Sequence, residues 1–261
     1  MSDHNHHGAH ALLEHFKSQE GIFSDFYSMH SRGTLGMYIE GLKNLKDVFQ
    51  LGDRCFRCID ERTPGGLHAA GPVILLEEDK GVRLLKTARA EGIYSHAGCG
   101  AAGIAFEKAD EKMRRFCVNP DNYGMFYARR IAKRAGIPYM GHLPVEPPFH
   151  VARMAIYDGT GSFDNSETKM RALGLPPAFV ISRRYHPDPE DAKKEASMAA
   201  TIATGSHGFG GLIKADKTPF MLLAVGVKKK EYSLSKLAAE AEEVAKEFKG
   251  RVIVDGFVAP V

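Results

Sequence analysis

The sequence has no tryptophan, only four cysteines in 261 residues, and no long apolar run. No stretch approaches the ~20 consecutive apolar residues that a membrane-spanning helix needs, so we expect no membrane association. The amino terminus lacks the apolar core of a signal peptide, and we therefore expect a cytoplasmic protein. Four cysteines in so long a chain do not make a disulfide framework. In a reducing compartment, metal binding is the better use for them.

Strong charge of either sign is also missing. The formal net charge of +3 is too small to argue for a nucleic-acid partner, and the basic residues are dispersed along the chain. An apolar content of 44% and a charged content of 26% are those of an ordinary globular protein. A chain of this length can bury one large core or two smaller ones.

Strand-like and helix-like segments alternate along most of the chain. This alternation predicts an α/β fold with a mainly parallel sheet flanked by helices. We divide the chain into an amino-terminal tail and helices (1–50), a core (51–165) and a carboxyl-terminal βαβαβ unit (166–261). Residues 1–8 are rich in histidine (His4, His6 and His7), and we expect them to be disordered. Apolar residues at helical spacing predict helices at 10–16 and 35–49.

Within the core, apolar runs predict strands at 72–76, 139–143 and 151–157. A polar, proline-bearing segment at 164–177 is the expected linker. Beyond it we expect strands at 178–182, 220–227 and 251–258, with helices at 188–204 and 233–249.

Two short motifs each follow a predicted strand. The first is Cys58-Ile59-Asp60-Glu61-Arg62, and the second is His96-Ala97-Gly98-Cys99-Gly100. Ligands of parallel sheets gather outside the carboxyl ends of the strands, so the two motifs can converge on one site. Two thiolates and one imidazole are the ligand set of an open catalytic zinc site. The motifs therefore predict one Zn²⁺ per chain, held by Cys58, His96 and Cys99.

The ordered pair Cys-x-Asp-x-Arg and His-x-x-Cys-Gly resembles the signature of the β-class carbonic anhydrases. Further likeness lies in His68-Ala69-Ala70-Gly71, in 82–90, and in 154–161, which resembles the last core strand and turn of that family. The resemblance covers about residues 50–165. One departure is that the segment between Cys58 and His96 is shorter than usual in the family, and this bears on the wall of the substrate pocket.

The resemblance implies a function: reversible hydration of CO2 to bicarbonate by a zinc-bound hydroxide. Asp60 would accept a hydrogen bond from the hydroxide, and Arg62 would keep Asp60 ionised and turned away from the metal. The backbone N–H of Gly100 would bind a substrate oxygen. His68 would either shuttle protons or serve packing. In that family the amino-terminal helices pack across a dimer, which implies a homodimer or a higher homo-oligomer.

Three other interpretations stay open. Relatives of that fold hydrolyse CS2 or COS on the same metal site. A catalytically silent zinc scaffold, binding a partner through 166–261, would keep the metal without turnover. A redox pair of Cys55 and Cys58 is disfavoured, because residues three apart on a strand point to opposite faces.

The carboxyl-terminal unit also holds faint echoes of both motifs, at 179–184 and 206–210, without either cysteine. A degenerate internal copy and chance similarity of two α/β units both explain these echoes.

Overall fold

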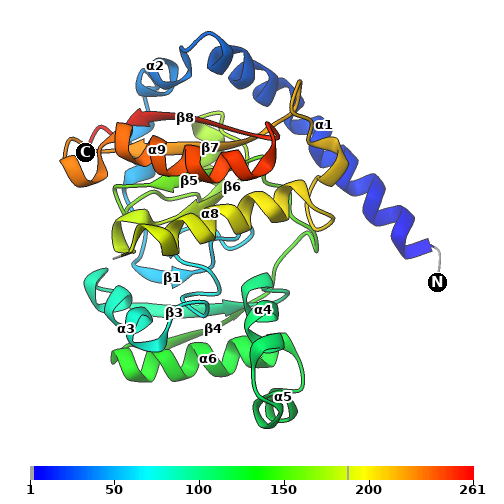
Figure 1. Cartoon of the computed structure of the whole chain (residues 1–261), viewed down its shortest axis with the longest axis vertical. Coiled ribbons are helices and arrows are strands. Elements are labelled where there is room, and N and C mark those ends of the chain that lie inside the picture. The colour runs from blue at the N-terminus through cyan, green and yellow to red at the C-terminus, as the bar shows by residue number, and fades with distance from the viewer. Residues whose placement is uncertain (1–2, 187) are drawn as a thin grey trace.

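The computed structural model describes residues 3–186 and 188–261, with side chains from residue 8 onward. The described residues form two four-stranded sheets in which all strands run parallel, with α-helices packed around both (Figure 1). The predicted α/β class with parallel strands is confirmed. Among the described residues, none of the helices combines the length and the hydrophobicity needed to cross a bilayer.

The first sheet has the strand order β2-β1-β3-β4. Its strands are β1 (Cys55–Arg57), β2 (Leu67–His68), β3 (Gly92–His96) and β4 (Tyr139–Leu143). Its helices are α3 (Glu78–Thr87), α4 (Gly100–Lys108), α5 (Glu111–Cys117) and α6 (Pro120–Ala135). Helix α6 begins where Asn119 accepts a hydrogen bond from the backbone of Asn122, and it ends at Gly136 in the left-handed conformation.

The second sheet has the order β6-β5-β7-β8. Its strands are β5 (Met154–Asp158), β6 (Ala178–Ile181), β7 (Phe220–Gly226) and β8 (Val252–Val258). Its helices are α7 (Glu167–Ala172), α8 (Pro189–Thr204) and α9 (Leu234–Ala245). Short 3₁₀ helices lie at Leu45–Phe49, Arg183–Tyr185, Gly210–Leu212, Lys230–Tyr232 and Lys246–Phe248. The predicted βαβαβ order of the carboxyl-terminal unit is confirmed by β6, α8, β7, α9 and β8.

Both faces of the second sheet are covered. Alternate residues of β5 point to opposite faces, as in any strand. Met154 and Ile156 pack in one cluster with Phe23, whereas Ala155 and Tyr157 pack in the cluster that includes α8 and α9. Burial on both faces explains why β5 and β7 have no exposed position.

The amino-terminal segment differs from the prediction. Helix α1 (Asp3–Ser31) is one long helix that already begins inside the tail predicted to be disordered. The histidine side chains of that tail lie outside the described residues. The helix predicted at 35–49 is divided at Gly41 into α2 (Leu35–Glu40) and a 3₁₀ helix. Apolar side chains of α1 and α2 are buried against the second sheet of the same chain, so these helices give no support to the expected dimer.

The apolar run at 72–76 was expected to be a strand, and this prediction is wrong. The run forms a turn after Gly71, and Val73 has a φ of 58°. The strand that pairs with β1 at this edge is β2 instead.

The segment around the expected linker is folded. Helix α7 lies within it, and Asp164 and Asn165 are buried. Strand β5, grouped above with the core, pairs with β6 and β7 in the second sheet. The two sheets are separate, and the backbone N–H of Val180 in β6 donates to the carbonyl oxygen of Ile59, just after β1, at 3.0 Å.

The two sheets share one strand order. In each, the first strand in the chain lies between the second and the third, and the fourth lies beyond the third. By this order β5 corresponds to β1, β6 to β2, and β7 to β3. The sequence echo at 179–184 therefore falls on the counterpart of β2 and not on that of β1.

Candidate metal centre

The two predicted motifs meet at one edge of the first sheet. Cys58 follows β1, His96 is the last residue of β3, and Cys99 directly precedes α4. Strands β1 and β3 are paired in parallel, so their carboxyl ends lie side by side. Each of the three residues offers one ligand atom, and these atoms all lie within 4.8 Å of one another. All three side chains are buried.

The imidazole of His96 has the orientation that a metal ligand requires. Its Nδ1 lies 2.9 Å from the carbonyl oxygen of Ala97 and can donate its hydrogen there. Its Nε2 is buried and has no hydrogen-bond partner among the described residues. A backbone carbonyl that binds one nitrogen fixes the tautomer and leaves the other nitrogen free for a metal. Bonds of about 2.0–2.3 Å place the ligand atoms of tetrahedral zinc roughly 3.4–3.8 Å apart, within the spacing found here.

The two thiols shift each other's pKa in opposite directions. A hydrogen bond from Cys99 lowers the pKa of Cys58 well below its usual range, against the effect of burial. The same hydrogen bond, together with burial, raises the pKa of Cys99. Although burial disfavours the imidazolium, the neighbouring Cys58 thiolate raises the pKa of His96 to about 9. These shifts favour a thiolate at Cys58, and a metal bound by the three residues would displace the protons that remain on them.

A glycine brings the backbone close to both sulfur atoms. The N–H of Gly71 donates to the Sγ of Cys58 at 3.3 Å. Gly71 has a φ of +61°, and a Cβ there would lie 3.4 Å from the Sγ of Cys99 and 2.4 Å from Ile74. A side chain at this position would crowd the site, so the conformation and the close approach both require glycine.

Asp60 and Arg62 form a buried ion pair beside the ligands. The guanidinium donates from Nε to Oδ1 (2.9 Å) and from Nη2 to Oδ2 (2.7 Å), and both side chains are 4% exposed. The Oδ2 of Asp60 lies 3.9 Å from the Nδ1 of His96. Burial opposes ionisation, but the hydrogen bonds from Arg62 and the nearby histidines lower the pKa of Asp60. Asp60 is therefore an ionised acceptor next to the possible metal ligands, held by Arg62.

Two further residues, Glu61 and His150, complete this network and were not identified from the sequence. The Nδ1 of His150 lies 3.0 Å from Glu61, and its Nε2 lies 3.2 Å from the Nη2 of Arg62. Glu61 also accepts the backbone N–H of Val151 at 2.7 Å. Burial disfavours the imidazolium, but Glu61 and Asp60 together raise the pKa of His150. Glu61 lies inside the first motif, between Asp60 and Arg62, and its position there was a signal that could have identified it. His150 is distant in the sequence and belongs to no motif.

Asp60, Glu61 and His150 also lie close enough together to hold a metal ion. Arg62 already bonds both oxygens of Asp60. We therefore interpret this group as an ion-pair network.

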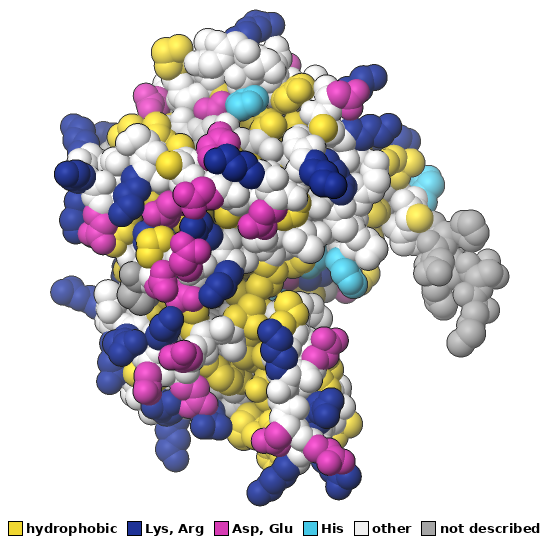
Figure 2. Space-filling view, viewed as in Figure 1, with side chains coloured by type: hydrophobic (Ala, Val, Ile, Leu, Met, Phe, Trp, Pro, Cys, Tyr) yellow, Lys and Arg dark blue, Asp and Glu magenta, His cyan; other side chains and the backbone are white. Residues whose placement is uncertain are grey.

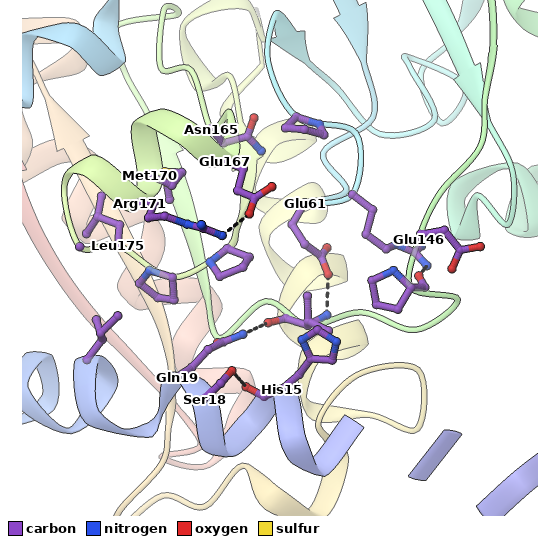
Figure 3. A pocket seen from close by; sticks show the side chains of 18 residues that line it. His15, Ser18, Gln19, Glu61, Glu146, Asn165, Glu167, Met170, Arg171 and Leu175 are labelled. Atoms are coloured by element: carbon purple, nitrogen blue, oxygen red, sulfur yellow. Dashed lines mark hydrogen bonds and ion pairs between the residues drawn. The ribbon is translucent and has the colours of Figure 1, made fainter. Parts of the chain in front are cut away.

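A cavity of about 520 Å³ borders the network on the side of α1. Its wall includes Glu61 and Arg62, but none of the three proposed metal ligands. Figure 3 shows Gln19 of α1 and Glu61 on its wall, and both bond the backbone of Val151. Much of the remaining wall is apolar, and its apolar residues are Ile22, Pro64, Pro147, Val151, Met170, Leu175, Pro176 and Pro177.

Comparison with known proteins identifies no relative: no family model, curated protein or solved structure matches this chain. The α/β fold and the group of possible metal ligands therefore stand on the structure alone.

His68 and Gly100 lie next to the centre in different ways. His68 is fully enclosed, with its Nδ1 2.6 Å from the carbonyl oxygen of Cys58 and its backbone N–H bonded to Ser182. Burial lowers the pKa of His68. This position fits packing better than proton exchange with solvent. Gly100 is exposed and is the first residue of α4, where helical N–H groups have no partner within the helix.

The other cysteines lie outside the ligand group. Cys55 is buried in β1, where its Sγ packs against Gly92 of the neighbouring strand. Cys117 is buried at the end of α5, and its Sγ lies 3.7 Å from the sulfur of Met113. All four cysteines are free thiols and are buried.

Proposed function

We propose that this chain is a zinc-dependent enzyme that reversibly hydrates CO2 to bicarbonate. The observation that carries the proposal is the combination of Cys58, His96 and Cys99 with an ionised carboxylate, Asp60, buried beside them. When bound, zinc supplies a water molecule acidified to a pKa of about 7, which is a nucleophile at neutral pH.

The residues around the ligands have separate roles in the proposed reaction. Asp60 accepts a hydrogen bond from the reacting water and sets its orientation. Arg62 occupies both carboxylate oxygens, keeps Asp60 ionised, and prevents it from turning to the metal. His150 and Glu61 hold the guanidinium in this position. They are positioning residues, since they act on the reaction through Arg62.

The cavity beside Arg62 has enough apolar wall to admit a small uncharged molecule next to the proposed site. CO2 carries no charge and no hydrogen-bond donor, and it partitions readily into an apolar space. Apolar side chains bring that space up to Arg62 and Glu61.

The test compares Asp60→Asn with Asp53→Asn. Both aspartates pair with an arginine through two hydrogen bonds, but Asp53 comes before β1 and belongs to neither group of possible metal ligands. We expect Asp60→Asn to retain zinc and to lose CO2 hydration by about 10–100-fold or more, as for other groups that orient a metal's ligands. Asp53→Asn should keep both.

Equal activity in the two variants would contradict the role of Asp60. Rates of CS2 and COS hydrolysis, measured on the same preparation, show whether the enzyme acts on CO2 or on one of the sulfur substrates. Zinc retention without turnover on any of the three would favour the scaffold.

A further inference from the structure

The second sheet carries a cavity at the place where the first sheet carries the metal centre. In an open parallel sheet, ligands bind outside the carboxyl ends of the strands at which the chain changes direction across the sheet. For the order β6-β5-β7-β8 these strands are β5, which ends at Asp158, and β7, which ends at Gly226. A cavity of about 580 Å³ lies there, lined by Thr160–Ser162 after β5 and by Val227–Lys229 after β7.

The wall of this cavity is basic. It contains Arg54, Arg184, Lys228 and Lys229, and no aspartate or glutamate. Among the described residues, only Lys229 of these four forms an ion pair with a carboxylate, to Glu231 at 3.7 Å. Figure 2 shows several lysine and arginine side chains along the left edge of the molecule, on the side where the chain ends in Figure 1.

The two arginines are held by neutral partners. Arg54 bonds the carbonyl oxygen of Ala88 and the hydroxyl of Tyr185, and Arg184 lies 5.4 Å from the ring centre of Tyr232. Their positive charges therefore remain available to a ligand. Like charges gathered on one wall repel one another, and a bound anion would relieve this repulsion.

The loop after β5 forms a fixed side of the cavity. Asp158 is fully buried and accepts hydrogen bonds from the backbone of Thr160 (2.8 Å) and Ser162 (3.1 Å). Gly161 has a φ of +71°, and a Cβ there would approach the ring of Tyr185 to 2.7 Å. The hydroxyl of Tyr185 donates to the carbonyl oxygen of Gly161. The cavity is thus shaped by the fold before any ligand binds.

We propose that this cavity binds a small phosphorylated molecule, with its phosphate group between the arginines and the lysines after β7. Several cations without carboxylate partners favour a ligand with more than one negative charge. The arginine fork matches phosphate oxygens in pairs. The volume lies within the range of small-molecule sites and exceeds what a bare phosphate ion fills.

The test measures binding of inorganic phosphate and of glycerol phosphate to the full chain by isothermal titration calorimetry. Acetate at matched ionic strength is the comparison anion. We expect binding of one phosphate probe per chain, with glycerol phosphate at least as tight as inorganic phosphate. Arg184→Gln and Lys228→Gln should each weaken binding about tenfold, because each removes a charge-assisted hydrogen bond.

The matched control is Arg114→Gln, which removes an exposed arginine of α5 and should leave phosphate binding unchanged. Lys228 is exposed, so its substitution leaves the packed core intact. The proposal is overturned if phosphate does not bind, if acetate binds equally well, or if both cavity variants bind phosphate as the original chain does. This result is independent of the zinc site, since neither variant touches it.

Discussion

Replacing Arg62 by methionine tests whether the ion pair beside the proposed metal ligands is buried as the structure describes. The change removes two hydrogen bonds to Asp60, one of 3.1 Å to the carbonyl oxygen of Pro147, and the 3.2 Å contact with the Nε2 of His150. Asp60 then keeps the backbone N–H of residue 62 (3.0 Å) and the more distant His150 (3.6 Å) as its partners. Removing one partner of a buried ion pair costs about 3–5 kcal/mol, because the other charge remains in a poorly solvating environment.

The chain offers a matched pair for comparison. Arg57 bonds Asp53 through both of its terminal nitrogens, each at 2.9 Å. The side chain of Asp53 is 39% exposed, whereas that of Asp60 is 4% exposed. Water can replace the arginine at the exposed carboxylate, so Arg57→Met should cost only about 1 kcal/mol.

The assay is urea unfolding of the three proteins in the presence of a chelator, so that metal binding does not contribute. In thermal unfolding of the same three proteins, the loss expected for Arg62→Met corresponds, for a chain of this size, to a fall in Tm of roughly 6–20 °C. Equal losses of stability in the two variants would refute the argument from burial.

Three further predictions concern the metal, the pH dependence and the packing of α1. Cys99→Ser should abolish zinc binding, whereas the control Cys55→Ser should leave one zinc per chain. Metal analysis after dialysis measures both, and retention of zinc in Cys99→Ser would exclude the ligand assignment. Glu61→Gln should lower the pKa of His150, which an NMR titration of the His150 imidazole measures. Because that pKa is raised in the folded chain, its contribution to stability is complete below about pH 6.5 and is lost as the pH rises through the raised value. The destabilisation by Glu61→Gln should therefore be larger at acidic than at alkaline pH, and a constant difference would contradict the pairing. Phe23→Ala leaves a cavity at a fully buried position of α1 and should lower the free energy of unfolding, measured in urea, by about 3–5 kcal/mol. A loss below about 1 kcal/mol would contradict the packing described.

The parts of the fold that the sequence predicts well are those in which one local pattern decides the structure. Strand β7 is a continuous apolar run, and helix α9 places Leu237, Ala241 and Val244 on one buried face. The ligand group belongs to the same class. Cys58 and His96 each come at the end of a strand, and parallel pairing of those strands brings them together.

Other parts depend on contacts between distant residues, which no local pattern contains. The run at 72–76 is apolar enough for a strand, but it turns because Gly71 must bring its backbone against Cys58 and Cys99. The pairing of His150 with Glu61 joins residues 89 positions apart. The segment at 164–177 looks like a linker by composition, yet Asn165 accepts a hydrogen bond from Gly65 and is buried. Strand β5 could be assigned to its sheet only from its neighbours.

The most direct test of the central claim is to measure zinc content and stopped-flow CO2 hydration on one preparation of the purified chain. We predict one zinc per chain and a hydration rate that rises from mildly acidic to alkaline pH, as a water bound to zinc ionises. Removal of the zinc by a chelator should abolish the rate, and return of zinc should restore it. A chain that binds no zinc, or one that hydrates CO2 equally well with and without it, would contradict the account.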